Sequence, residues 1–390
     1  MNIQEIIQNY DTSQITIGAL GGHSALDVCH GAKKHGFRTV VVAVKGRDKT
    51  YSQYYRTRGE KGCVDEVILV DKFSDILNED VQEKLRELNT IFIHNRYFWV
   101  YFDDYSKVEN DFKVPIFGLR EGVKLEERDQ PLNQYHLLEK ADLRMPKIVR
   151  AGEVPMSKDE TRSAIEDHFA KNKTPLLVKV NEAIRGYERA FFVVMKVEDY
   201  FEKGAEMVAS GTINQEDLDK AVIEEFIIGA QVNLNFFYSN LTDELELMGT
   251  DARRQTSLDG FLRLDAKAQT ELIESGYKPS MIETGHIACT TKESIIEKAY
   301  EAGEKFVKTM REEVAPGIIG PFALQGAMAS YEGKEEFVTF DVSMRIPGSP
   351  GTRFTPSTGY MYGECISYGE RIAMEIEKAL ESGELEKILT

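Results

Sequence analysis

The apolar positions of the first 125 residues form short runs separated by stretches with helical spacing. The runs lie at residues 15–20, 37–44, 67–70, 90–94 and 114–119. Between the first two runs, apolar residues recur every three or four positions from Leu26 to Ala32, and a second helical pattern covers residues 79–88. Strands that alternate with helices predict an open α/β sheet, which we expect to form a first domain over residues 1–125.

The turn after the first apolar run carries the first candidate site. It reads Gly21-Gly22-His23-Ser24, and Ser24 is followed three residues later by Asp27, a pattern that predicts an N-cap and the start of a helix. Backbone N–H groups at a helix start favour a phosphate or carboxylate, so His23 and Ser24 are candidate ligand-binding residues. The alternative is a Gly-Gly turn used only for its tightness.

The rest of the chain pairs strands with helices in an α+β pattern. The expected strands are 176–180, 190–194, 221–228, 232–238, 244–249, 322–330 and 336–346. A long amphipathic helix is predicted at 293–313 and a last helix at 372–380. We expect two further units, residues 126–250 and residues 251–390, the second of which includes the last helix.

The last two strands are predicted to form a hairpin with a chemically distinct face. Because side chains alternate along a strand, Asp341, Ser343 and Arg345 share one face, and a short turn would place Gln325 of the partner strand on it. Gln325 and Asp341 offer two hard oxygen ligands for Mg²⁺, and Arg345 a cation for a phosphoryl group. The alternative is an amphipathic strand with a solvated polar face. The residues expected to face the core are Val338, Phe340, Val342 and Met344.

Two lysines and an acidic linker are candidates for nucleotide binding. Lys179 ends an apolar run and Lys147 precedes another, and each could contact phosphate as a point charge or lie at the surface with its stem buried. The linker at residues 222–229 could read an adenine edge through its backbone, with Glu224 or Glu225 reaching a ribose, or could be an ordinary strand end with solvated acids.

Composition narrows the class of protein. Lys and Arg number 48 against 65 Asp and Glu, a net charge of −17, so nucleic acids and anionic membranes are not expected partners. The N-terminus lacks a signal-peptide pattern and no apolar run reaches 18 residues. The four cysteines include no Cys-x-x-Cys pair, which is typical of a protein of the reducing cytosol. We therefore expect a cytoplasmic protein.

Several stretches, taken in order, resemble the PurP family of the ATP-grasp superfamily. The stretches are Gly22-His23-Ser24-Ala25-Leu26, residues 31–37, residues 114–118, Ile223-Glu224-Glu225-Phe226, residues 259–264 with Ala266-Lys267, residues 319–325 and residues 340–345. The resemblance covers nearly the whole chain. It implies an ATP-grasp fold with an N-terminal open α/β (preATP-grasp) domain, and ATP- and formate-dependent formylation of the ribotide AICAR to FAICAR, a step of purine (IMP) biosynthesis, through formyl phosphate.

The resemblance also implies site residues. The residues implied to bind ATP are Lys147, Lys179, Glu224, Glu225, Phe226 and Ile227. Those implied to bind the ribotide are His23, Ser24, Arg96 and Ser257. The implied ligands of Mg²⁺ or Mn²⁺ are Gln325 and Asp341, and the implied catalytic cations are Lys179 and Arg345. It makes a homo-oligomer the expected assembly. On this basis an Asp341→Ala change is expected to abolish turnover and leave the fold intact.

Departures from the family pattern fall on the substrate and phosphate loops. The glycine-rich loop after the second lysine is Asn181 to Arg189 here, with one glycine and two acids, and a small serine-bearing turn is replaced by His94-Asn95-Arg96. Ser257 stands where an asparagine is usual, Asp341 where glutamate is usual, and the final loop at 348–357 is rewritten. Two alternatives therefore stay open: a related ligase acting on another carboxylate or ribotide, and a nucleotide-binding subunit without catalysis.

Overall fold

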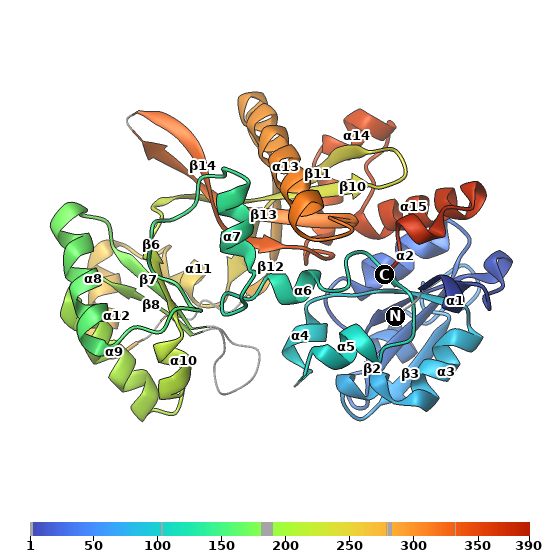
Figure 1. Cartoon of the computed structure of the whole chain (residues 1–390), viewed down its shortest axis with the longest axis horizontal. Coiled ribbons are helices and arrows are strands. Elements are labelled where there is room, and N and C mark those ends of the chain that lie inside the picture. The colour runs from blue at the N-terminus through green and yellow to red at the C-terminus, as the bar shows by residue number, and fades with distance from the viewer. Residues whose placement is uncertain (1–2, 103, 181–189, 278, 280–282, 332) are drawn as a thin grey trace.

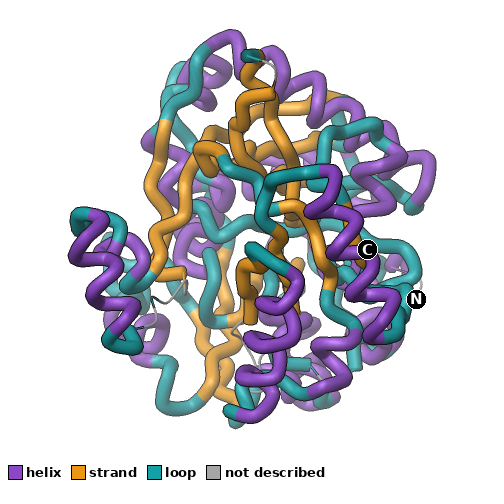
Figure 2. The backbone as a smooth tube through the Cα atoms, turned by 90° about the vertical axis from the view of Figure 1, so that its left-hand side faces the viewer, coloured by secondary structure: helices purple, strands orange, loops and turns teal. Residues whose placement is uncertain are grey.

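In the part of the chain that it describes, the computed structural model contains three β-sheets wrapped by helices (Figure 1). The structure describes residues 3–390 except 103, 181–189, 278, 280–282 and 332. The first sheet lies in the blue part of the chain, the second in the green part, and the third between them beneath the long helix α13. Seen from the side, the strands run through the interior while helices lie mostly outside (Figure 2).

The first sheet is the predicted open α/β sheet. Its five strands are all parallel, in the order β3-β2-β1-β4-β5. They are β1 (Thr16–Leu20), β2 (Arg38–Val44), β3 (Glu66–Val70), β4 (Thr90–Ile93) and β5 (Ile116–Phe117), with helices α2 (Ala25–Lys34) and α3 (Glu79–Glu87). In parallel sheets ligands bind at the carboxyl ends of the strands, and here His23 follows β1 and His94 follows β4.

The end of the described chain returns to this first sheet. Helix α15 (Tyr368–Ser382) packs against α2, and Thr390 exchanges backbone hydrogen bonds of 2.9 and 3.0 Å with Ile116. Gly31 and Gly369 make the helix contact possible, because a Cβ on Gly31 would lie 2.1 Å from the carbonyl carbon of Gly369. The last helix was expected to belong to the third unit, but its apolar face is part of the core of the first.

The second sheet is antiparallel, in the order β6-β9-β7-β8. Its strands are β6 (Ile148–Arg150), β7 (Leu176–Val180), β8 (Ala190–Val194) and β9 (Val222–Glu225), and α8 (Lys158–Lys171) and α9 (Val197–Ala209) accompany them. Leu176, Val178 and Ile223 share its core with Ile165 of α8 and Tyr200 of α9. The central position of β7 explains why Lys179, near its end, is buried.

The third sheet is antiparallel, in the order β12-β11-β10-β13-β14. Its strands are β10 (Gly229–Ser239), β11 (Glu244–Gln255), β12 (Glu283–Cys289), β13 (Gly320–Tyr331) and β14 (Lys334–Ser343), and α13 (Glu293–Glu313) packs on it. Residue 250, the predicted boundary, lies within β11, so this sheet takes strands from both predicted regions.

Shorter helices connect these layers. They are α1 (Ile3–Ile7), α4 (Tyr97–Val100), α5 (Ser106–Asn110), α6 (Gly122–Leu125), α7 (Gln134–Lys140), α10 (Gln215–Asp219), α11 (Leu258–Phe261), α12 (Ala266–Glu274) and α14 (Ser357–Tyr362). The short helical turns are Thr12–Gln14, Thr50–Tyr54, Phe73–Leu77, Pro350–Phe354 and Leu385–Lys387.

The predicted hairpin is confirmed, and so is the alignment of Gln325 with Asp341, which are cross-strand partners of β13 and β14. Val338, Val342 and Met344 are buried as predicted, but Val338 lies outside the core cluster that contains Val342 and Met344. A β-bulge between Gln325 and Gly326 adds one residue to β14, so Val342 packs in the core, while beyond the bulge Phe337 rather than Val338 contacts that core. The extra residue, Phe340, lies beside the candidate site.

The start of α2 also differs from the prediction. Ser24 precedes the helix but has a left-handed φ of 65° and makes no side-chain cap. Its hydroxyl donates to the carbonyl of Pro347 at 2.8 Å, and Asp27 accepts the Gly369 N–H at 2.9 Å. Both side chains of the expected capping pair therefore hold distant segments together.

Candidate active site

Lys179 lies at the buried junction between the second and third sheets. Its side chain is 3% exposed, and its Nζ lies 2.7 Å from Glu224 Oε1. Lys179 Nζ also donates to the carbonyl of Phe340 at 2.9 Å and to the hydroxyl of Tyr135 at 3.3 Å. The hydroxyl of Tyr135 in turn donates to Glu224, so Lys179 and Glu224 form a closed group with Tyr135 of α7.

Burial governs the charge of this lysine. Burial lowers the pKa of Lys179, the neighbouring Glu224 carboxylate opposes this, and the resulting pKa is about 8. Arg128 adds to the lowering because it is a second buried cation nearby. At neutral pH Lys179 therefore carries its positive charge in a poorly solvated position, where attraction to phosphate is strong.

Arg128 joins this group to the predicted metal-binding pair. Its Nη2 donates to Asp341 Oδ1 at 2.8 Å and its Nε to the Tyr135 hydroxyl at 3.2 Å, and its side chain is 1% exposed. Opposite Asp341, Gln325 donates from Nε2 to Ser343 Oγ at 2.8 Å and accepts from Arg253. Both predicted ligands are thus buried, adjacent, and held by guanidinium groups.

This donor set fits Mg²⁺. The ion prefers hard oxygen ligands and commonly takes one or two protein groups with substrate phosphates and water completing its shell. Asp341 provides a carboxylate and Gln325 an amide oxygen on paired positions of neighbouring strands. Within the described residues, no group of three or more His, Cys, Asp and Glu side chains is arranged to hold a metal.

Arg345 and Arg96 share acidic partners from the segment after α6. Arg345 Nε lies 3.3 Å from Glu126 Oε1, and Arg96 binds Glu127 and lies 3.5 Å from Glu126. The side chains of both glutamates are 2–3% exposed. Burial raises the pKa of Glu126, whereas the cations Arg345 and Arg96 oppose that change. Through these glutamates Arg96 of the first domain is therefore tied to Arg345, which follows the end of β14.

A second polar network covers the same face of the third sheet. Asp251 of β11 accepts hydrogen bonds from Asn233 at 3.1 Å and Asn235 at 2.6 Å, and it contacts His286 Nδ1. Ser349 from the final loop donates to Asp251 at 3.2 Å. The sequence analysis missed this network, although Asn233 and Asn235 sit at alternate positions in an otherwise apolar strand and mark its polar face.

His286 continues the network towards Gln325. Its Nε2 lies 2.9 Å from Glu283 Oε1, and Glu283 Oε2 lies 3.4 Å from Nε of Arg253. Burial lowers the pKa of His286, but the hydrogen bonds that its ring donates to the carboxylates of Asp251 and Glu283 outweigh burial and raise that pKa to about 9. Burial alone would raise the pKa of Glu283. The hydrogen bond with His286 and the charge of Arg253 outweigh the effect of burial and lower the pKa of Glu283 to about 2. Both groups are charged at neutral pH.

His23 lies at the edge of these networks. A Cβ on Gly348 would lie 2.8 Å from its Nε2, so the backbone of the final loop packs against the ring. Burial, and next the charge of Arg345, lower the pKa of His23 to about 3, which leaves the imidazole neutral. Asn95 donates to the carbonyl of His23 at 3.2 Å and fixes the turn.

The remaining predicted residues lie on the linker and its neighbours. Lys147 is exposed, and its carbonyl accepts the Glu225 N–H at 2.9 Å, which places the predicted first lysine beside the linker. The N–H of Phe226 donates to Pro175 at 2.8 Å, and Ile227 is half-buried. Ser257 precedes α11 with a φ of 46°. The loop Asn181 to Arg189 lies outside the described residues.

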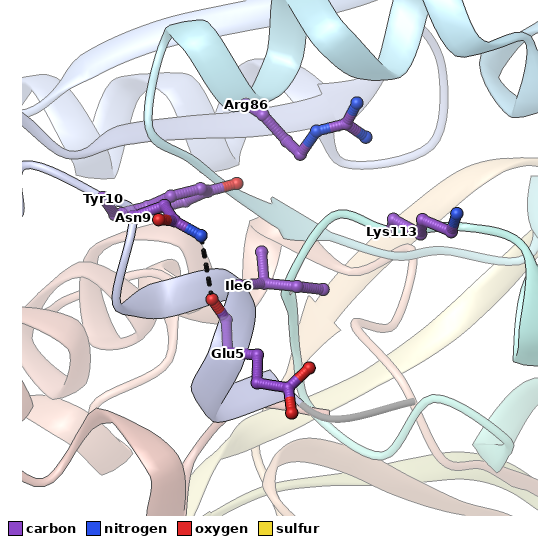
Figure 3. Close-up of a pocket in the computed structure, with 6 residues that line it drawn as sticks. All are labelled: Glu5, Ile6, Asn9, Tyr10, Arg86 and Lys113. Atoms are coloured by element: carbon purple, nitrogen blue, oxygen red, sulfur yellow. Dashed lines mark hydrogen bonds between the residues drawn. The ribbon is translucent and has the colours of Figure 1, made fainter.

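A separate pocket lies at the other end of the strands of the first sheet, and Figure 3 shows the residues that line it. Its lining residues are Glu5, Ile6, Asn9, Tyr10, Arg86 and Lys113. The hydroxyl of Tyr10 donates to the carbonyl of Thr90, the first residue of β4, so the pocket is at the amino ends of the strands. His23 and His94 follow the carboxyl ends, and the predicted site residues are not among those lining this pocket.

Solved structures with this arrangement of domains define the class of the protein. The chain superposes on an IMP biosynthesis protein PurP from Thermococcus kodakaraensis with a TM-score of 0.65 and 25% identity, covering 96% of this chain and 100% of the other. It also superposes on biotin carboxylase from Campylobacter jejuni, with a TM-score of 0.60 and 12% identity over 93% of this chain and 71% of that one. The fold is that of an ATP-grasp protein.

Sequence comparison identifies the family. The chain is 37% identical over 392 residues to 5-formaminoimidazole-4-carboxamide-1-(beta)-D-ribofuranosyl 5'-monophosphate synthetase of Methanobrevibacter smithii, covering 100% of this chain and 98% of the relative. The chain belongs to this PurP family. Two family models, described as a protein of unknown function (DUF1246) and a domain of unknown function (DUF1297), match residues 17–149 and 199–390. In the part of the chain that the structure describes, no helix is long and apolar enough to cross a membrane.

Proposed function

We propose that this protein is an ATP-dependent carbon–nitrogen ligase that formylates AICAR to FAICAR with formate as the carbon donor. The observation that carries the proposal is that Lys179, Gln325, Asp341 and Arg345, chosen from the sequence, lie in one buried polar region beside the turn of His23. Full-length similarity to synthetases of this name supports the same activity.

The chemistry requires two transfers. A formate oxygen attacks the γ-phosphorus of ATP, the bond to the β,γ-bridging oxygen breaks, and ADP leaves with the electron pair. The 5-amino group of AICAR then attacks the carbon of formyl phosphate, inorganic phosphate leaves, and the nitrogen loses one proton. Phosphoryl transfer depends mainly on positioning and on cations around the transferring group, and Lys179 and Arg345 supply charge there.

The other predicted residues have distinct roles in this proposal. Lys147 and Lys179 contact the phosphates of ATP, and the linker of Glu224, Glu225, Phe226 and Ile227 contacts its adenosine. His23, Ser24, Arg96 and Ser257 contact the ribotide. The neutral imidazole of His23 can both donate and accept a hydrogen bond.

Gln325 and Asp341 would hold Mg²⁺ or Mn²⁺. When bound, the ion neutralises phosphate charge and orients the transferring group. Arg128 donates to Asp341 and Arg253 donates to Gln325, and these two contacts hold the side chains that would bind the ion.

The test is release of ADP by the purified protein with ATP, Mg²⁺, formate and AICAR, with each component omitted in turn and the ribotide product identified by mass. ADP and a formylated ribotide only with all four components support the proposal. Turnover of another carboxylate or ribotide, and none of AICAR, would assign a related ligase activity. ATP binding without ADP release from any pair would indicate a subunit that does not catalyse.

We also expect a cytoplasmic homo-oligomer. Phe354 and Tyr360, both 80% exposed, lie close in sequence in the region after β14 and offer apolar contact area. Sedimentation of the purified protein measures its assembly, and a monomer at all concentrations would contradict the expectation.

A further inference from the structure

Arg253 and His286 form a two-cation site whose occupant is a carboxylate of the chain itself. The two oxygens of Glu283 are divided between them: Oε1 lies 2.9 Å from His286 Nε2 and Oε2 lies 3.4 Å from Arg253 Nε. His286 contacts one carboxylate oxygen at hydrogen-bond distance, and Arg253 lies at ion-pair distance from the other, so both cations attract the same carboxylate. The arrangement therefore shows, in the chain itself, which kind of ligand the two cations can bind.

His286 is held on its far side by a buried carboxylate, whereas Glu283 is partly exposed. Asp251, which is 1% exposed, contacts His286 Nδ1 and is itself held by Asn233 and Asn235. The opposite ring nitrogen, Nε2, is thereby directed towards Glu283. The side chain of Glu283 is 42% exposed at the start of edge strand β12, so it has room to turn into solvent when another carboxylate takes its place.

The two cations are close to residues proposed for both transfers of the reaction. Arg253 also donates to Gln325, the proposed metal ligand, and the charges of Glu283 and His286 act on His23, the proposed ribotide contact. An acid that is first phosphorylated and then attacked by the ribotide amine must lie between these two places.

We propose that Arg253 and His286 bind the carboxylate substrate, and that Glu283 occupies their site until that substrate displaces it. This inference rests on the proposed function for the identity of the substrate, a small carboxylate of the formate class. Arg253 and His286 are then binding residues of the reaction, and Glu283 is an internal competitor.

The decisive variant is Glu283→Gln, which removes the competing charge and keeps the side-chain size. If Glu283 occupies the site about nine-tenths of the time, its removal lowers the KM for formate about tenfold, because apparent affinity scales with the competent fraction. The KM for ATP is expected to stay constant. Glu335→Gln is the matched control, since Glu335 is an exposed carboxylate paired with Lys292 at the far end of the hairpin. A KM for formate that is unchanged or raised in Glu283→Gln overturns the proposal.

A binding measurement separates this inference from the proposed function. The Nε2 resonance of His286 in ¹⁵N-histidine-labelled protein, assigned with His286→Gln, is followed during titration with formate and then acetate, without nucleotide. A saturable shift that occurs at lower formate concentration in Glu283→Gln supports the site even if AICAR is not the ribotide. No shift up to concentrations that saturate turnover overturns it, and a wild-type protein that shifts but does not turn over formate contradicts only the proposed function.

Discussion

Replacing Asp341 by alanine removes more than a proposed metal ligand, because its carboxylate neutralises the buried guanidinium of Arg128. The hydrogen bond between them is 2.8 Å, and the side chains of Arg128 and Asp341 are 1% and 11% exposed. Breaking a buried ion pair by removing one partner costs about 3–5 kcal/mol. Arg128 keeps its 3.2 Å contact with the Tyr135 hydroxyl, so we expect the lower end, about 3 kcal/mol off the free energy of unfolding. The sequence led us to expect that this change leaves the fold intact; the structure adds that it lowers the stability of that fold.

Urea unfolding followed by far-ultraviolet circular dichroism measures the effect. Asp71→Ala is the control, because Asp71 pairs with Lys45 at the surface, with 79% and 58% of the side chains exposed, and exposed pairs contribute about 0–1 kcal/mol. Combining Asp341→Ala with Arg128→Met removes both charges and is expected to recover part of the loss. If Asp341→Ala is no more destabilising than Asp71→Ala, the argument from the buried pair is refuted.

Three further predictions concern the charge of two buried groups and one close helix contact. The kcat/KM for ATP is expected to fall above about pH 8 as Lys179 loses its proton, and a profile flat to pH 10 would contradict this. The pKa of His286 is raised from 6.5 to about 9, so the stabilisation that its positive charge provides is complete below pH 6.5 and is lost as the pH rises through about 9. The Tm difference between wild type and His286→Gln should therefore shrink over that pH range. A Tm difference that stays constant would contradict this prediction. Gly31→Ala places a methyl group against the backbone of Gly369 and is expected to cost about 1–3 kcal/mol in urea unfolding, whereas Gly260→Ala, which meets open space, should not destabilise; equal midpoints for the two would exclude the steric explanation.

The sequence predicted those features that depend on local periodicity. The open α/β sheet, the hairpin of β13 and β14 and the pairing of Gln325 with Asp341 follow from apolar runs, alternation and a short turn. The bulge at Phe340 was not predictable in this way, because one added residue leaves the alternation pattern looking regular while it reverses the facing of the strand beyond it.

Side-chain contacts between residues that are far apart along the chain could not be predicted from local sequence patterns. Arg128 and Asp341 are separated by 213 residues, and nothing near Arg128 in the sequence marks it as part of the site. The N-cap predicted at Ser24 failed for the same reason: its hydroxyl bonds Pro347, 323 residues away. Family resemblance supplied the roles of the lysines and the linker, but it gave no signal for Arg253 and His286.

Because α15 and Thr390 pack against the first domain, the core of that domain is completed only after α15 has been translated. The apolar face of α2 is covered by Ile372 and Ile376, which are translated more than 330 residues after α2 itself. While the chain is being made, that face is open to solvent and to other proteins, and contacts so far apart in sequence form slowly. The first domain is therefore the first to be translated but among the last to be completed, and we expect a fragment of residues 1–125 to be aggregation-prone unless residues 366–390 are supplied with it.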